Sequence, residues 1–187
     1  MIKQGDRISN PRTGQTMIFR KTGKETNGAL LEIECYNPMS DAREPIHIHP
    51  RQDSSNEVLS GQLHFWVDGK TNIIGPGEHI DIPAGVPHCF WNENNTIAHH
   101  LARFSPALTI ADFFDTYFAL SRDGKINADG RPNFFQGSLI MLKHKNNIRV
   151  IKPPWILQII SYLVVAPLGF LMGYRSTYQS KNKEHRA

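Results

Sequence analysis

Residues 77–92 read GEHIDIPAGVPHCFWN, and they occupy every fixed position of the pattern G-x5-P-x-G-x2-H-x3-N. Pro83 and Gly85 supply the backbone geometry of a tight turn between two strands. His88 follows this turn, and we expect it to enter the next strand with its side chain pointing inward. The stretch therefore predicts a β-hairpin that presents one imidazole to the inside of a barrel.

A pair of imidazoles lies upstream, in the stretch PIHIHP at residues 45–50. Residues two apart in a strand face the same side, so His47 and His49 present both rings to one point. Neutral imidazole is a ligand for zinc, copper, iron and nickel. An H-x-H pair alone is a weak signal, and it is the combination with His88 that predicts a metal site.

The sequence around both motifs predicts further strands. From residue 2 to about residue 106, short runs rich in β-branched and apolar residues alternate with turn signals, which is typical of an all-β sandwich or barrel. Residues 62–67 place Leu63, Phe65 and Val67 on one face, and Asp68-Gly69 then predicts a tight hairpin turn.

These motifs resemble those of the cupin superfamily, and within it the small bacterial single-domain cupins of RmlC-like type. Cupins carry a first motif, G-x5-H-x-H-x3-4-E-x6-G, and the second motif quoted above. Gly61 would close the first motif and Gly77 opens the second, with 15 residues between them, as in compact cupins. The resemblance covers residues 10–106 and implies an all-β cupin jelly roll, a double-stranded β-helix barrel, here with added C-terminal α-helices.

The same resemblance implies a ligand set for a divalent transition metal, which would be iron, manganese, nickel, copper or zinc. His47, His49 and His88 match the three histidine ligands of the family. Where the family has a glutamate, this chain has Ser54, and Asp53 beside it is the candidate fourth ligand.

Two alternatives to Asp53 stay open at this point. Gln52 is a second side chain that would fill the gap left by the missing glutamate. The other alternative is a pocket that is lined by the three histidines and holds no metal. The opening glycine of the first motif is also replaced, by Asp41, so the first motif departs from the family at two positions.

The pattern changes after residue 108, and we divide the chain into a cupin β-barrel (1–108), a helical extension (109–150) and a hydrophobic helical tail (151–187). Apolar residues recur at helical spacing after Thr109, which resembles a capping residue, and Gly124 is placed where this helix should stop. A second helix is expected at 133–144.

Residues 153–174 carry no charge and are long enough to cross the apolar layer of a membrane. Pro153-Pro154 can start a helix, and Pro167 should kink or break it midway. Membrane contact through 153–174 and packing against the barrel or a dimer partner are equally open. A homodimer is expected because barrel edge strands often pair.

Composition narrows the function. The 187 residues carry a mild net charge of +4 without a dense basic stripe, so we expect no nucleic-acid partner. Residues 1–14 lack the apolar run of a signal peptide, which favours a cytoplasmic protein, with membrane association only through the tail.

Two functions follow from the resemblance. The first is a dioxygenase-like oxidoreductase, acting through its metal on a small oxygenated organic molecule in the barrel. The alternative is a non-catalytic module that binds a small molecule or a metal.

Overall fold

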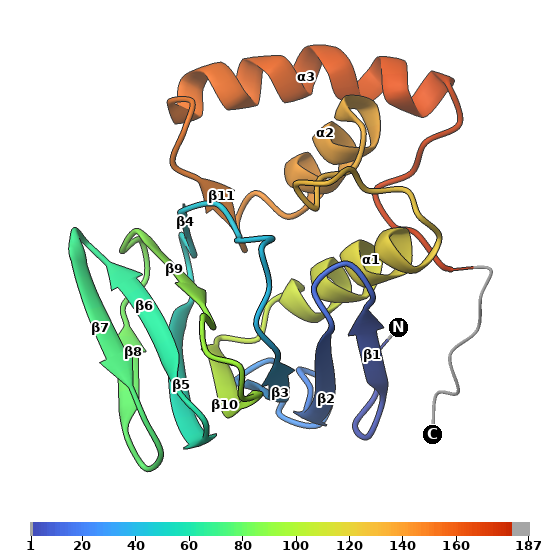
Figure 1. Cartoon of the computed structure of the whole chain (residues 1–187). Coiled ribbons are helices and arrows are strands. Elements are labelled where there is room, and N and C mark those ends of the chain that lie inside the picture. The colour runs from blue at the N-terminus through green and yellow to red at the C-terminus, as the bar shows by residue number, and fades with distance from the viewer. Residues whose placement is uncertain (1, 181–187) are drawn as a thin grey trace.

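The computed structural model describes residues 2–180, which form two antiparallel β-sheets and three α-helices (Figure 1). One sheet has the order β1-β2-β3-β10-β5-β8, with β1 (Arg7–Asn10), β2 (Gln15–Lys21), β3 (Leu31–Asn37), β10 (Ala98–Ser105), β5 (Asp53–Ser60) and β8 (His79–Ile82). The other has the order β11-β4-β9-β6-β7, with β11 (Arg149–Val150), β4 (His47–Ile48), β9 (His88–Trp91), β6 (Leu63–Val67) and β7 (Lys70–Ile74). This arrangement confirms the predicted all-β jelly roll with added C-terminal helices.

The β6–β7 hairpin shows how local sequence sets the register. Asp68 and Gly69 both have positive φ, at 45° and 86°, as a two-residue type I′ turn requires. The turn pairs Leu63 with Ile74. Because side chains alternate along β6, Leu63 and Phe65 both face inward and are fully buried between the sheets.

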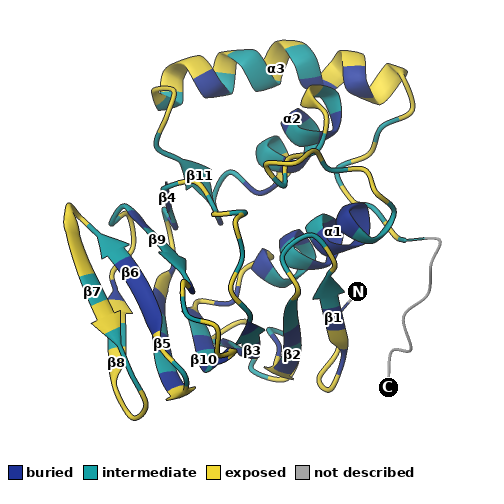
Figure 2. Ribbon diagram, viewed as in Figure 1, coloured by how far each residue is buried: buried dark blue, intermediate teal, exposed yellow. Residues whose placement is uncertain are grey.

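Helix α1 (Ile110–Arg122) lies over the six-stranded sheet (Figure 2). Its buried apolar side chains join the larger of the two apolar clusters. The helix ends before Gly124, whose φ is +63°, as the sequence predicts. The expected side-chain cap is wrong. The hydroxyl of Thr109 makes no cap bond, because it contacts Nδ1 of buried His144 at 3.2 Å instead.

Helix α2 (Phe134–Lys143) occupies the second stretch where a helix was expected. Asn133 caps its first turn, with Oδ1 accepting a hydrogen bond from the backbone N–H of Gln136 at 3.0 Å. The helix places Ser138 and Ile140 in the protein interior.

Helix α3 (Trp155–Leu171) is the outermost element and packs on α2 (Figure 1). It continues through Pro167, so of the expected kink or break, the break does not occur. Buried Ala166 and Gly169 lie on either side of this proline. A methyl group on Gly169 would come within 3.1 Å of Phe135, so the two helices approach closely here, and this packing holds both halves of α3 in one helix.

The alternative that residues 153–174 span a membrane is also wrong. Only 17 of these residues are helical, which gives α3 a length of about 25 Å, short of the ~30 Å apolar layer of a bilayer. In the described part of the chain, no helix has both the length and the apolar character needed for crossing. Residues 181–187 of the expected tail lie outside the described residues.

Candidate metal centre

Three imidazoles meet where β4 and β9 pair. His47 and His88 are direct partners across this ladder, and their ring centroids lie 4.4 Å apart. His49 follows His47 by two residues, and its ring lies 5.1 Å from that of His47 and 5.2 Å from that of His88. Each of the three offers one nitrogen, and these nitrogens all lie within 4.8 Å of one another. The structure therefore brings together three of the four predicted ligands.

The second nitrogen of each ring faces a backbone carbonyl. Nδ1 of His47 lies 3.0 Å from the carbonyl oxygen of Pro45. Nδ1 of His49 lies 2.7 Å from the carbonyl oxygen of Asn147, and Nδ1 of His88 lies 2.8 Å from that of Val86. A carbonyl oxygen only accepts hydrogen bonds, so each Nδ1 carries the proton and donates it. Nε2 is then left with a free lone pair, which is the tautomer that binds metal.

Burial keeps these rings uncharged at neutral pH. The pKa of His47 is lowered to about 4, that of His49 to about 3 and that of His88 to about 4, and for the last two repulsion by His47 contributes to the shift alongside burial. Three neutral, oriented imidazoles form a donor set that suits a divalent transition metal with further coordination positions for water or a ligand. The residues present therefore fit such a metal.

Asp53 is not brought to the three imidazoles. It is exposed at the start of β5, and its Oδ1 accepts a hydrogen bond from the backbone N–H of Ala84 at 2.9 Å. Gln52 is buried elsewhere, with Nε2 donating to the carbonyl of Pro106 at 2.8 Å. Among the described residues, the group that could hold a metal consists of His47, His49 and His88 alone.

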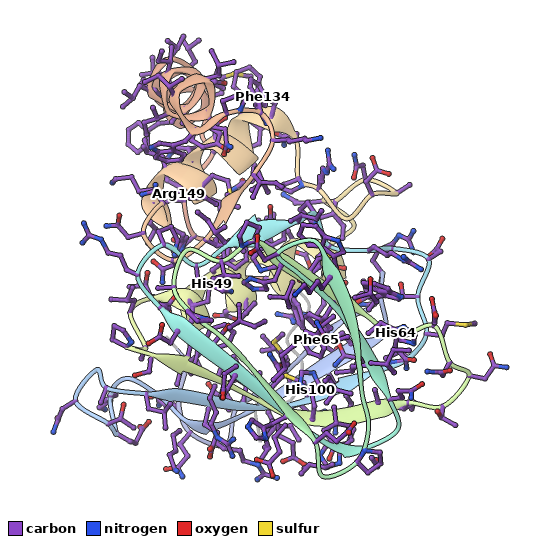
Figure 3. The ribbon with its side chains drawn as sticks, turned by 90° about the vertical axis from the view of Figure 1, so that its left-hand side faces the viewer. His49, His64, Phe65, His100, Phe134 and Arg149 are labelled. Atoms are coloured by element: carbon purple, nitrogen blue, oxygen red, sulfur yellow. The ribbon has the colours of Figure 1, made fainter. Side chains whose placement is uncertain are left out.

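A cavity of about 490 Å³ opens between the barrel and the helices, and the three imidazoles form part of its wall. Aromatic side chains from both the sheets and α1 line it, namely Phe65, Phe90, Phe104, Phe113, Phe114, Tyr117 and Phe118. In Figure 3, His49 lies at the end of the barrel near the helices, and Phe65 and His100 lie deeper inside. Trp91 is not part of this wall, because it stacks on His64 instead.

Glu44 is a cavity residue that the motifs do not indicate. Its Oε1 accepts a hydrogen bond from the backbone N–H of Phe90 at 3.0 Å and lies 4.0 Å from Nδ1 of His47. Partial burial raises the pKa of this carboxyl to about 7. It lies in an irregular segment before β4, where strand periodicity does not predict side-chain direction.

His100 is a second polar group on the cavity wall. The amide Nδ2 of Asn37 lies 2.7 Å from Nε2 of His100, so the amide donates and Nδ1 carries the ring proton. Within the described residues, that Nδ1 has no hydrogen-bond partner. Its sequence neighbour His99 faces the other side of β10 and contacts Glu34 at 2.7 Å. The Nδ1–H group of His100 is thus a hydrogen-bond donor without a partner at the cavity wall.

Residues 36–102 match the family model described as the Cupin domain. Over 76 residues the chain is 30% identical to quercetin 2,3-dioxygenase of Bacillus subtilis (strain 168), a match that covers 41% of this chain and 22% of that protein. The chain thus spans well under half of the length of this curated relative.

Solved structures of similar shape include an RmlC-like cupin from Shewanella frigidimarina NCIMB 400, with 20% identity and a TM-score of 0.48. That match covers 59% of this chain and 93% of the other. KdgF from Halomonas sp. is 18% identical with a TM-score of 0.44, and that match covers 50% of this chain and 79% of the other.

Proposed function

We propose that this chain, a member of the cupin superfamily, is a metal-dependent oxidoreductase of dioxygenase-like type. Its substrate would be a small, oxygenated organic molecule bound in the cavity. The observation that carries this proposal is the convergence of three neutral imidazoles on the wall of an aromatic cavity of about 490 Å³. The named activity of the Bacillus relative supports the same class of reaction.

The histidines would hold the metal through Nε2, while their Nδ1–H groups donate to backbone carbonyls and keep the rings in position. A bound divalent transition metal supplies Lewis-acid polarisation of a substrate oxygen and, for iron or copper, reactivity towards dioxygen. Because His47, His49 and His88 are all neutral, the charge of the ion is not offset by these ligands.

The remaining cavity residues would bind and orient the substrate. Phe104 and Phe114 offer flat apolar surfaces and exclude water, and the cavity volume lies within the range of ordinary small-molecule sites. Glu44 is a carboxylate that can take a proton from a substrate hydroxyl at its free oxygen. The unpaired Nδ1–H of His100 can donate to a substrate oxygen deeper in the barrel.

One observation favours a second function, a module that binds a small molecule or metal without turnover. Within the part of the chain that the structure describes, no carboxylate joins the three-histidine group, and Ser54 occupies the position of the family's glutamate. A site with less negative charge holds a hard ion such as manganese less tightly.

The two functions are separated by one experiment. The protein is purified without chelators, its bound metals are quantified, and oxygen uptake is followed with a catechol, a flavonol and a diketone. Stoichiometric metal together with oxygen uptake on one of these substrates supports the enzyme. Stoichiometric metal with saturable ligand binding and no oxygen uptake on any of them supports the binding module.

A further inference from the structure

The outward side of α3 is a continuous apolar surface. Many residues of this helix are exposed, as the yellow ribbon shows (Figure 2). The residues of this surface are between 50% and 82% exposed, and none is charged. We call this surface the α3 face, and it consists of Ile156, Leu157, Ile160, Leu163, Val164, Leu168, Phe170 and Leu171. Single exposed apolar residues are ordinary, but a contiguous set marks a surface that contacts a partner or a membrane.

The chain around the α3 face is basic and contains no acid. From residue 131 to residue 180 there is no Asp or Glu, and the Lys and Arg residues are Arg131, Lys143, Lys145, Arg149, Lys152 and Arg175. Lys152 and Arg175 flank the helix at its two ends. Among the described residues, none of these cations forms an ion pair with a carboxylate.

This charge pattern distinguishes two partners that could cover the α3 face, a second copy of the chain and a membrane. A second copy of the chain, docked through α3, would bring the same cations together with no acidic residue from 131 to 180 to offset them. A bilayer with anionic headgroups offers both an apolar layer for the helix and counter-charges for the cations. We propose that the α3 face docks on an anionic lipid surface, with the helix parallel to the membrane plane.

Both ends of the helix suit this position. The guanidinium of Arg149 lies 4.0 Å above the ring of Trp155, and that of Arg175 lies 4.4 Å from the ring of Phe170. A cation beside an aromatic ring combines headgroup contact with a side chain that prefers the interface. The opposite side of α3 is covered by α2, so only the α3 face is left for lipid.

The lipid contact goes beyond the proposed function, because it uses none of the metal-site residues. The lipid contact would also affect the metal site, because Tyr162 of α3 and Lys152, which precedes this helix, line the same cavity. A docked molecule would therefore hold its cavity next to the bilayer, where lipophilic substrates dissolve.

Vesicle co-sedimentation of the full chain tests the proposal. The chain should sediment with vesicles of phosphatidylcholine plus phosphatidylglycerol and far less with phosphatidylcholine alone. Leu163→Glu combined with Val164→Glu should weaken binding by about tenfold or more, and Lys152→Gln by about fivefold. The matched control is Ile73→Glu, an apolar residue on β7 that is 52% exposed, and it should bind like the unmodified chain.

Three outcomes would overturn the lipid contact. The first is no sedimentation with either vesicle, and the second is equal sedimentation of the double variant and the unmodified chain. The third is a dimer in sedimentation equilibrium that the double variant dissociates, without lipid binding, because a second copy is then the occupant. Urea unfolding checks that each variant is folded, and Leu163→Gln repeats the comparison with a smaller change.

Discussion

His47 and His88 are 41 positions apart in the chain and stand directly opposite each other in the β4–β9 ladder. Their rings are 4.4 Å apart, and each donates its Nδ1 proton to the carbonyl two residues before it. The ladder therefore fixes the distance between the rings, and the backbone fixes their tautomer. The positions of the donors are therefore set by the backbone of the fold.

Asp53→Ala should leave metal content unchanged. Asp53 is turned outward to the N–H of Ala84, so its removal loses one hydrogen bond and lowers the free energy of unfolding by about 1 kcal/mol. Metal analysis and urea unfolding measure the two effects. Loss of metal from this variant would restore Asp53 as a ligand and contradict the three-histidine site.

Glu44→Gln should lower turnover by about a hundredfold while the metal stays bound, because the amide keeps the shape of the side chain but cannot take a proton. Oxygen uptake and metal content are measured on the same preparation of each protein. Glu93→Gln, at an exposed carboxyl near His64, is the matched control and should retain full turnover. Equal turnover of Glu44→Gln and the unmodified chain would remove Glu44 from the chemistry.

Ala102→Phe should block the cavity. Ala102 faces it from β10, and a phenyl ring there occupies space that a flavonol would need. We expect flavonol binding, followed by tryptophan fluorescence, to weaken at least tenfold, while overpacking lowers the free energy of unfolding by about 1–3 kcal/mol. Unchanged affinity would show that the ligand binds outside the barrel.

Acid should destabilise the metal-free chain through His100. Burial lowers the pKa of His100 to about 3, whereas an unfolded histidine titrates near pH ~6.5. The two states bind the same number of protons above about pH 6.5, and between there and about pH 3 the unfolded state binds one more. Within this window the histidine alone should therefore remove about 1.4 kcal/mol of stability per pH unit as the pH falls.

The check is urea unfolding of the unmodified chain and His100→Asn in the presence of chelator, at several pH values between neutral and mildly acidic. The variant should be less stable at neutral pH and lose stability less steeply as the pH falls. Parallel curves for the two proteins would show that His100 is not held neutral in the fold.

The barrel and the histidine cluster are predictable from sequence because short-range rules decide them. Strand parity puts His47 and His49 on one face, and the Pro83–Gly85 turn delivers His88 to the neighbouring strand. The same rule, applied to β5, places Ser54 inside and Asp53 outside, as the buried and exposed residues alternate there. The family motif alone favours Asp53 as a ligand, because the motif specifies the spacing between residues and not the direction of their side chains.

The course of α3 through Pro167 and the cavity position of Glu44 are not predictable in this way. Both depend on contacts between distant segments. Gly169 of α3 packs on Phe135 of α2, and the N–H of Phe90 in β9 holds the carboxylate of Glu44. A local pattern carries no information on either pairing, so propensity and spacing fail at these positions.

If His47, His49 and His88 share one ion, the metal content of the purified chain reveals it. After incubation with iron, manganese, nickel, copper or zinc and removal of the excess, the unmodified chain should retain about one ion per chain of at least one of these metals. His88→Gln should retain less than about a tenth of that, whereas His79→Gln, at an exposed imidazole on β8, should match the unmodified chain. Full metal content in His88→Gln, or none in the unmodified chain with any of the metals, would contradict the account.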